Sequence, residues 1–279
     1  MRLVIADNKE AAAYLRGKAA VSPETFGRLP AELRARAFTA ARVADFDLLR
    51  DLLERIAEIP EGGDWKKARR EIAEELSPYT ENEKAARAKA ELVLRTNGFQ
   101  AYGAARYRQQ KATAEALPYW QYLTVGDDNV RDSHAALDGL VLPADDPFWD
   151  THYPPWDFNC RCVVAAVTRE EAGRMEEADA DKEPAERRVL NEKQLEAARE
   201  GRVSRGIRGT ADVRPPAERT GEPGAYAWRP GRVAPELREI DKRYDPRTAA
   251  AFRQALASDK VQAPDGRVIS VREFLEADA

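Results

Sequence analysis

The sequence predicts an α+β protein with a mainly helical N-terminal half, a small antiparallel sheet with a long irregular loop, and a loosely attached C-terminal extension. Three observations support this prediction. Apolar residues recur at helical spacing in the first part of the chain, the spacing changes to two at Tyr119, and the composition changes after residue 170. A chain of 279 residues is long enough for one large domain or two modest domains with a buried core.

Helices are predicted for most of the N-terminal half. Between about Glu32 and Ile59 the pattern predicts one helix with an apolar stripe at spacings of three and four residues, formed by Phe46, Leu49, Leu53 and Ile56. A second helix is expected from Asp64 to Leu76. Thr80 and Glu83 have the form of a capping box, which predicts the start of a long helix that ends at about residue 114.

The predicted sheet begins after this helix. Residues 119–125 alternate between two faces and predict a strand, and residues 160–167 predict a second strand. Between them, Val130 to Asp138 is expected to form a short helix that Gly139 ends. Residues 143–159 are rich in proline, aspartate and aromatic residues, and they predict a long irregular loop.

The C-terminal part has a different composition. Residues 170–186 contain eight acidic and two basic residues, and residues 201–231 are rich in glycine, proline and arginine. Two short helices are expected in residues 238–279, on either side of a turn at 263–266. We therefore predict four segments: an N-terminal helical region 1–62, a core 63–169, a linker 170–231 and a small helical extension 232–279.

Charge and composition exclude several classes of protein. The net charge of −4 and the pI near 5.6 argue against a general nucleic-acid coat, so contact with DNA would need a local basic face. No stretch approaches the ~20 apolar residues of a membrane span, and we expect no membrane partner. Charged residues follow the first five residues too closely for a secretory signal, which predicts a cytoplasmic protein. Two cysteines make no disulfide framework.

Short motifs in a fixed order distinguish the stretch from Tyr119 to Thr168. An Asp-x-x-Val-Arg-x-x-His-x-x-Leu-x-Gly run begins at Asp127, and Pro-Phe-Trp, Pro-Pro and Asn-Cys-Arg-Cys elements follow it. Together with the helix before it, this block resembles the phage Mu protein F-like (head morphogenesis) family over roughly residues 10–170. The residues that match the family motif are Arg95, Asn97, Arg131, His134, Gly139, Pro155, Asn159, Cys160, Arg161 and Cys162.

The resemblance implies a minor head protein of a tailed phage or prophage, which acts in head morphogenesis and procapsid assembly near the portal. Implied partners are the portal protein and capsid or scaffold proteins, with phage DNA as a further candidate. The implied location is the virion head or procapsid, and the host cytoplasm during assembly. The family implies no enzyme, so we expect no catalytic residue. The alternative is a Mu F-like delivery module with a C-terminal effector segment, although no histidine or cysteine follows Cys162.

The histidines and cysteines of the chain all lie between residues 134 and 162. His134, His152, Cys160 and Cys162 are therefore candidate metal ligands. In a strand, the two cysteines would point to the same face. They could bind zinc with a histidine, or they could be small buried hydrophobes while His134 braces the loop. Because Cys-x-Cys is not the usual Cys-x-x-Cys of zinc knuckles, packing without a cofactor is our expectation and zinc the alternative.

Charged residues near the motif suggest a polar network. Asp127, Arg131 and His134 follow each other at spacings of four and three residues, which would bring their side chains together on a short helix. An acid–base pair is one interpretation of this pattern. We favour a structural network that fixes the long loop, because loop backbone groups need hydrogen-bond partners.

Four residues are candidates for contact with a partner or with DNA. Residues 84–111 carry seven basic residues and one acidic residue, and within them Arg95 and Arg106 share the apolar stripe of the helix. Trp149 and Trp156 belong to the aromatic and proline-rich loop. This loop could fold back on the sheet as a small core, or it could expose its aromatic rings as a binding surface.

Overall fold

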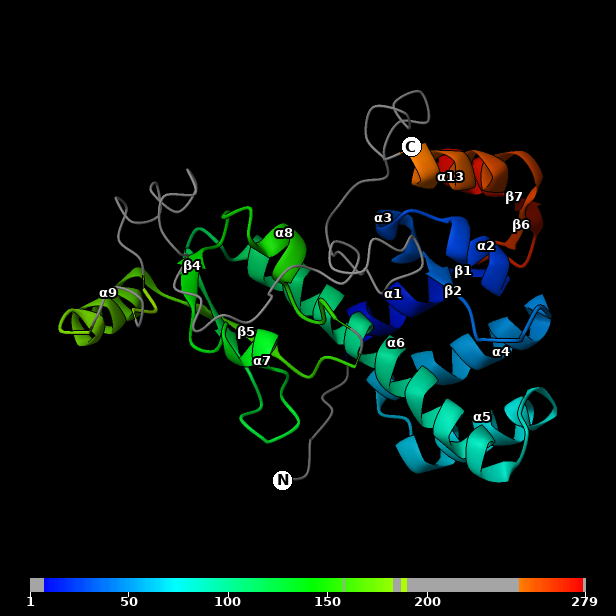
Figure 1. Ribbon diagram of the computed structural model, residues 1–279, viewed down its shortest axis with the longest axis horizontal. Helices are drawn as coiled ribbons and strands as arrows, with labels where there is room; N and C mark the ends of the chain where they lie inside the picture. Colours follow the sequence, from blue (N-terminus) through cyan, green and yellow to red (C-terminus); the bar gives the residue numbers. More distant parts are fainter. Residues whose placement is uncertain (1–7, 158, 183–186, 190–245, 278–279) are drawn as a thin grey trace. The chain divides into compact units, whose positions relative to one another are not determined.

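The computed structural model describes residues 8–157, 159–182, 187–189 and 246–277, and it confirms the α+β class (Figure 1). The chain forms two compact units. Unit 1 contains residues 1–105, 157–159 and 216–279, and unit 2 contains residues 106–156 and 160–215. The predicted boundary at residue 62 does not separate two cores, because residues on both sides of it belong to one apolar core in unit 1. The four predicted segments followed composition, whereas the two units follow packing.

Unit 1 is built from helices around an aliphatic core. Its α-helices are α1 (Lys9–Arg16), α2 (Pro23–Arg28), α3 (Ala31–Arg34), α4 (Phe46–Ala57), α5 (Trp65–Leu76), the first part of α6 (Glu83–Ala112), α13 (Pro246–Ser258) and α14 (Val271–Glu276). Two 3-10 turns, η1 (Ile59–Glu61) and η2 (Ser77–Tyr79), follow α4 and α5. The predicted stripe of α4 is confirmed, since Leu49, Leu53 and Ile56 are fully buried.

The first long helix is shorter than predicted. The structure has α3 and then strand β2 (Ala37–Phe38) where the pattern predicted a helix from Glu32. Helix α4 begins only at Phe46, because the Asp45 carboxylate accepts hydrogen bonds from the backbone N–H groups of Asp47 and Leu48. The helical pattern therefore did not reveal strand β2, whose Ala37 and Phe38 pair with Ala19 and Ala20.

The predicted capping box before α6 is wrong. The Asn82 side chain accepts a hydrogen bond from the backbone N–H of Ala85, at 2.9 Å. Thr80 instead donates its hydroxyl to the carbonyl oxygen of Ser77, at 3.0 Å, and so belongs to the turn before the helix. An asparagine is as good a cap as a threonine, which is why the sequence pattern did not separate the two residues.

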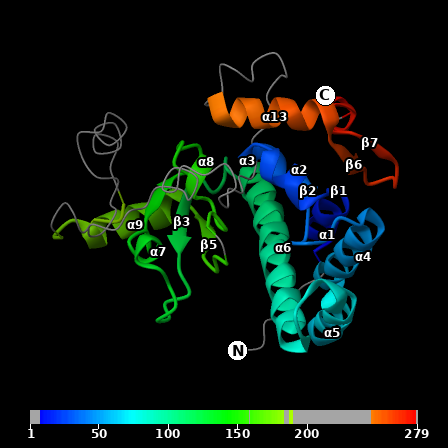
Figure 2. The ribbon, with the colours of Figure 1, turned by 45° about the vertical axis from the view of Figure 1, so that its right-hand side comes forward.

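A four-stranded sheet joins both ends of the chain within unit 1. Its order is β2, β1 (Ala19–Val21), β6 (Lys260–Gln262) and β7 (Val268–Ser270). Strands β1 and β2 are parallel, whereas β6 is antiparallel to both β1 and β7. Figures 1 and 2 both draw the red β6–β7 hairpin beside the blue β1 strand.

The described C-terminal residues are thus more than two helices around a turn. Helices α13 and α14 are present, but the turn with Gly266 at φ +86° joins two strands. Phe252 and Val261 are buried in one apolar cluster with Leu33 and Ala37 from the N-terminal region. Residues 246–276 therefore share a core with the N-terminal region, and the predicted glycine- and proline-rich stretch 201–231 lies outside the described residues.

Unit 2 contains the small antiparallel sheet that the sequence predicted. Strand β3 (Tyr119–Leu123) is central, between β4 (Val141–Pro143) and β5 (Val163–Val167). Short helices α7 (Asp132–Ala135) and α8 (Trp149–His152) interrupt the connections, and α9 (Arg169–Asp179) follows β5. A capping box of Thr168 and Glu171 starts α9, so the first part of the acidic segment is a helix. In the part of the chain that the structure describes, no helix has the length and apolar character of a membrane span.

A buried lysine is an unusual feature of unit 1. Lys18 is 1% exposed, and its Nζ atom donates a hydrogen bond to Gln100 Oε1 at 3.1 Å. The ammonium group also lies 4.8 Å from the centre of the Tyr14 ring. Burial lowers the pKa of Lys18 to about 7, because a charged amine is poorly solvated inside the protein.

Replacing Leu53 by alanine should destabilise unit 1. Leu53 is fully buried in the α4 stripe, and a Leu→Ala change in a packed core costs about 2–5 kcal/mol through lost burial and the cavity that remains. Chemical denaturation followed by far-UV circular dichroism measures the change in the free energy of unfolding. Asp51→Ala is the matched control, since Asp51 is exposed on the same helix; equal effects of both changes would contradict the described packing of α4.

Replacing Lys18 by methionine should change how stability depends on pH. The unfolded lysine keeps a pKa near 10.5 and the folded one has a pKa of about 7, so the unfolded state binds more protons between these values. Stability of the native protein should therefore rise with pH across this window, by at most ~1.4 kcal/mol per pH unit from this group.

The Lys18→Met protein should not show this rise of stability with pH. Its free energy of unfolding should exceed that of the native protein by the largest amount near pH 7 or below. Free energies of unfolding measured from pH 6 to pH 10 test this expectation. Lys66→Met, at an exposed position, should leave the slope unchanged. A native slope that persists in Lys18→Met would show that other groups cause it.

Candidate functional site

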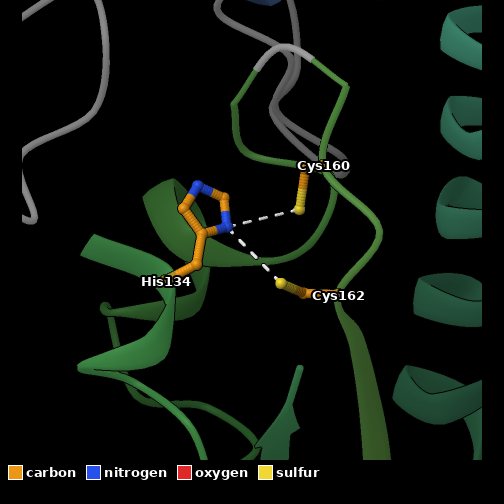
Figure 3. Close-up of side chains that lie close together, drawn as sticks. All are labelled: His134, Cys160 and Cys162. Atoms are coloured by element: carbon orange, nitrogen blue, oxygen red, sulfur yellow. Dashed lines mark hydrogen bonds between the residues drawn. The ribbon is translucent and has the colours of Figure 1, made fainter. Parts of the chain in front are cut away.

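His134, Cys160 and Cys162 converge at one point in unit 2 (Figure 3). The His134 Nδ1 atom lies 3.4 Å from Cys162 Sγ and 3.6 Å from Cys160 Sγ. The three possible ligand atoms all lie within 4.8 Å of one another. His134 and Cys160 are buried and Cys162 is half-buried, so the cluster lies at the edge of the interior.

Local backbone conformations bring the three side chains together. His134 lies on α7, and the turn after this helix ends at Gly139, whose φ of +78° is the left-handed conformation expected of it. The N–H of Gly139 then donates to the carbonyl oxygen of Tyr122, which fixes the turn on β3. On the other side, Asn159 has a φ of +55°, a conformation that asparagine tolerates better than most residues.

The cysteines do not lie in a strand, contrary to the prediction. Strand β5 begins at Val163, and both cysteines precede it in an irregular segment. Their common direction therefore does not come from the two-residue period of a strand. It comes from the turn at Asn159 and from the pairing of β5 with β3, which begins opposite Leu123.

Two aromatic residues enclose His134. The Trp156 ring stacks on the imidazole, with ring centres 4.3 Å apart and planes 13° apart. Trp156 Nε1 donates a hydrogen bond to Tyr122 Oη at 2.8 Å, and this oxygen lies 3.2 Å from His134 Nδ1. Trp156 and Tyr122 are both buried, so the polar atoms of the cluster bond mainly to each other rather than to bulk water.

The neighbours of the two thiols shift their pKa values in opposite directions. The hydrogen bond with Cys162 lowers the pKa of Cys160 well below its usual value, and His134 lowers it further although burial opposes the shift. The same hydrogen bond with Cys160, together with burial, raises the pKa of Cys162. Burial also raises the pKa of Tyr122, so its phenol stays protonated.

Polar contacts surround the cluster, but they differ from the predicted network. Asp127 pairs with Arg161 through two contacts of 2.6 Å, which lower the pKa of Asp127 and raise that of Arg161. The Asp138 carboxylate accepts hydrogen bonds from the backbone N–H and the hydroxyl of Thr124, at 2.7 and 2.9 Å. Arg131 is exposed just before α7, where its carbonyl oxygen accepts the N–H of His134.

The aromatic and proline-rich loop is a core and not an exposed surface. Trp149 and Trp156 are each 1% exposed, so neither indole is available as the predicted contact residue. Trp149 packs edge-on against Trp120 with ring centres 5.6 Å apart, and Pro155 is buried after a cis Pro154–Pro155 bond. Phe158, which belongs to the same loop, lies outside the described residues.

The remaining predicted residues lie in other surroundings. His152 stacks on Phe148 with ring centres 4.3 Å apart, so it belongs to the aromatic core and is not a member of the cluster of possible metal ligands. In unit 1, Asn97 donates its side-chain amide to the Val93 carbonyl oxygen, and Arg95 lies 5.8 Å from the Phe99 ring centre. Arg106, on the part of α6 that belongs to unit 2, is half-buried and its charge acts on Tyr153.

Two buried polar residues of unit 2, Tyr122 and Gln110, were not predicted from the sequence. Tyr122 is central to the cluster, and its only signal was the alternation that placed it on the same strand face as Trp120. Gln110 is buried at the end of α6, where it donates to the Val164 carbonyl oxygen at 2.9 Å and accepts from Tyr153 Oη at 2.7 Å. A buried glutamine near the end of a helix gives no pattern in the sequence, because its partners are distant in the chain.

Two kinds of chemistry suit a histidine with two thiols, namely metal binding and nucleophilic attack by a thiolate. A lowered Cys160 pKa favours a thiolate. However, Cys160 is only 4% exposed, which leaves little room for a substrate to reach its sulfur. The surroundings therefore suit a small bound ion better than they suit catalysis.

Comparison with known proteins finds a family model that matches part of the chain, including the cluster. Residues 54–165 match the family model described as "Phage Mu protein F like protein". Over 185 residues the chain is 35% identical to a protein of Escherichia phage Mu that is provisionally named capsid assembly protein F. It is also 36% identical over 152 residues to the Mu-like prophage FluMu F protein of Haemophilus influenzae. No solved structure matches the chain.

These matches cover only part of each relative. The match with the phage Mu protein spans 61% of this chain and 42% of the relative, and that with the Haemophilus protein spans 48% and 35%. The chain thus corresponds to less than half the length of either relative. All three cluster residues lie within the matched range 54–165.

Replacing Tyr122 by phenylalanine should destabilise unit 2. The change removes the acceptor of the Trp156 N–H, and a buried donor left without its acceptor costs about 1–3 kcal/mol. Tyr119→Phe is the matched control on the same strand, because Tyr119 is half-buried and should tolerate the change within ~0.5 kcal/mol. Chemical denaturation followed by tryptophan fluorescence measures both; equal stability of the two variants would argue against the described network.

Proposed function

Because residues 54–165 of this chain belong to the Phage Mu protein F-like family, we propose that the protein acts in assembly of the head of a tailed phage or prophage. The observation on which this proposal depends is the 35% identity, over 185 residues, to the phage Mu protein named for capsid assembly. The match includes the ordered motif block of residues 127–162, which contains the three cluster residues His134, Cys160 and Cys162.

We propose a structural role and not a catalytic one. The thiol with the lowered pKa is buried, and the aromatic loop beside it forms a core rather than an open binding groove. Both observations support a module that presents its outer surface to other head proteins. Capsid or scaffold proteins are therefore the proposed partners, and a position near the portal follows from the family resemblance.

Contact with packaged DNA is a finer part of the proposal. Residues 84–111 of α6 carry seven basic residues and one acidic residue, although the whole chain has a net charge of −4. Lys84 and Arg108 are exposed on this helix, whereas Arg95 and Arg106 are half-buried. Exposed lysine and arginine side chains on one helix suit phosphate groups, and such binding should weaken as salt increases.

The alternative, a delivery module with a C-terminal effector, receives less support. Residues 246–276 contribute strand β6 to the sheet of unit 1 and several side chains to its core. A segment that completes the sheet of its own carrier is poorly suited to act as separate cargo. Residues 190–245 lie outside the described residues, so they support neither the assembly role nor the delivery module.

Particles purified from the phage or induced prophage should contain this protein at low copy number. Quantitative mass spectrometry of gradient-separated procapsids and filled heads, with the major capsid protein as the internal reference, measures the ratio. The control is a lysate in which the major capsid gene carries a nonsense mutation, so that no particles form. There the protein should remain at the top of the gradient.

Absence of the protein from both particle types would contradict the proposal. Sedimentation to the same fraction without particles would also contradict it, because the protein would then aggregate by itself. Chemical crosslinking of isolated procapsids tests the finer placement: crosslinks to the portal protein support it, and crosslinks to the capsid lattice alone restrict the proposal to a general role in assembly.

A further inference from the structure

We propose that His134, Cys160 and Cys162 bind one zinc ion, through His134 Nδ1 and the two Sγ atoms. This inference concerns the chemistry of unit 2 and does not depend on the role of the protein in the phage head. It replaces packing of the thiols, which the Cys-x-Cys spacing alone favoured. The reason is the geometry of the three side chains, which their positions in the sequence could not reveal.

The separations between the three atoms fit a tetrahedral zinc site. Zinc has bonds of ~2.3 Å to sulfur and ~2.0 Å to nitrogen, so tetrahedral angles require sulfur–nitrogen separations of about 3.5 Å. The two observed separations are 3.4 Å and 3.6 Å. The same geometry requires a sulfur–sulfur separation of about 3.8 Å, and the two sulfurs lie within 4.8 Å of each other.

Hydrogen bonding alone explains the convergence poorly. A ring nitrogen of histidine has either one proton to donate or one lone pair to accept with. Three groups, Cys160 Sγ, Cys162 Sγ and Tyr122 Oη, nevertheless lie 3.2 to 3.6 Å from the same atom, His134 Nδ1. The nitrogen can form a good hydrogen bond with only one of these three groups. A cation between the nitrogen and the two sulfurs would instead interact favourably with all three ligand atoms.

The type of ligand selects zinc among common metal ions. Thiolate and imidazole are soft and borderline ligands, which bind Zn²⁺ and disfavour Mg²⁺ and Ca²⁺. Two thiolates and one neutral imidazole with a divalent cation have no net charge, which suits a site that is largely buried. His152, the only other histidine of the chain, stacks on Phe148, and among the described residues the cluster offers three ligands.

The surrounding residues would hold the ligands in place. Trp156 stacks on the His134 ring and fixes its plane. Tyr122 accepts the Trp156 N–H, so its own hydroxyl proton is available to a sulfur. Because His134 and Cys162 are 28 residues apart, the ion would tie α7 to the segment before β5 and thereby stabilise the loop between them.

Elemental analysis of the purified full chain tests the proposal. We expect about one zinc per chain after purification under reducing conditions and dialysis against metal-free buffer. His134→Gln, Cys160→Ser and Cys162→Ser should each lose most of the zinc. His152→Gln is the matched control and should keep it, because His152 belongs to the aromatic core.

A second measurement avoids the risk that a ligand variant fails to fold. The native chain is stripped with a chelator under reducing conditions, and zinc is returned while a competing dye reports the free ion. One equivalent should bind, raise the thermal midpoint by several degrees, and protect both cysteines from a thiol reagent. Cobalt in place of zinc should give thiolate charge-transfer absorption and the visible bands of a tetrahedral ion.

Three results would overturn the proposal. The first is zinc well below one per chain together with no uptake by the stripped protein. The second is equal zinc in the native chain and in all three ligand variants. The third is a mass lower by two hydrogens in protein purified without reductant, with no zinc bound under reducing conditions, which would show that Cys160 and Cys162 form a redox pair instead.

Discussion

The packing of unit 2 depends on the hydrogen bonds and ring contacts of the buried His134 side chain. An imidazole in the interior must bond to other buried polar groups, because it loses its contacts with water. Here Trp156 covers one face of the ring, while Tyr122 and two thiols lie around one of its nitrogens. These partners come from β3, from the aromatic loop and from the segment before β5, so the position of a single ring orders three parts of the unit.

The aromatic loop supplies the apolar part of the same arrangement. Trp149, Tyr153 and Trp120 form edge-on pairs, and Tyr153 also donates its hydroxyl to Gln110. Edge-on pairs of this kind add to the burial of large rings. A three-stranded sheet has little area of its own to bury, so folding the loop back on β3 provides much of the core of this unit. This is why a stretch without long helices or strands is nevertheless ordered.

Unit 1 is stabilised in a different way. Its core is made mostly of alanine, leucine, isoleucine and valine from helices, and its sheet pairs β1 with β6, which lie more than 230 residues apart in the chain. Closing a chain segment of this length costs conformational entropy, which the buried cluster around Phe252 and Val261 offsets. Residues 19–37 and 249–275 therefore stabilise each other through a shared sheet and a shared apolar cluster. Residues 106–156 and 160–215, which contain His134 and both cysteines, are assigned to the other unit.

The sequence by itself determined the α+β class, the apolar stripe of α4, the sheet of unit 2 and the resemblance of residues 54–165 to the Mu F-like family, because these depend on period, turn residues and ordered motifs that are local in the chain. It also singled out His134, Cys160 and Cys162, since few residue types bind soft metals. Only the tertiary structure decided that His152 and Trp149 belong to a core, that the cysteines precede the strand, that Tyr122 contacts His134, and that Gln110 binds Tyr153. Those outcomes depend on contacts between residues far apart in the chain, and the direction of a side chain outside regular structure follows from such contacts rather than from any local period.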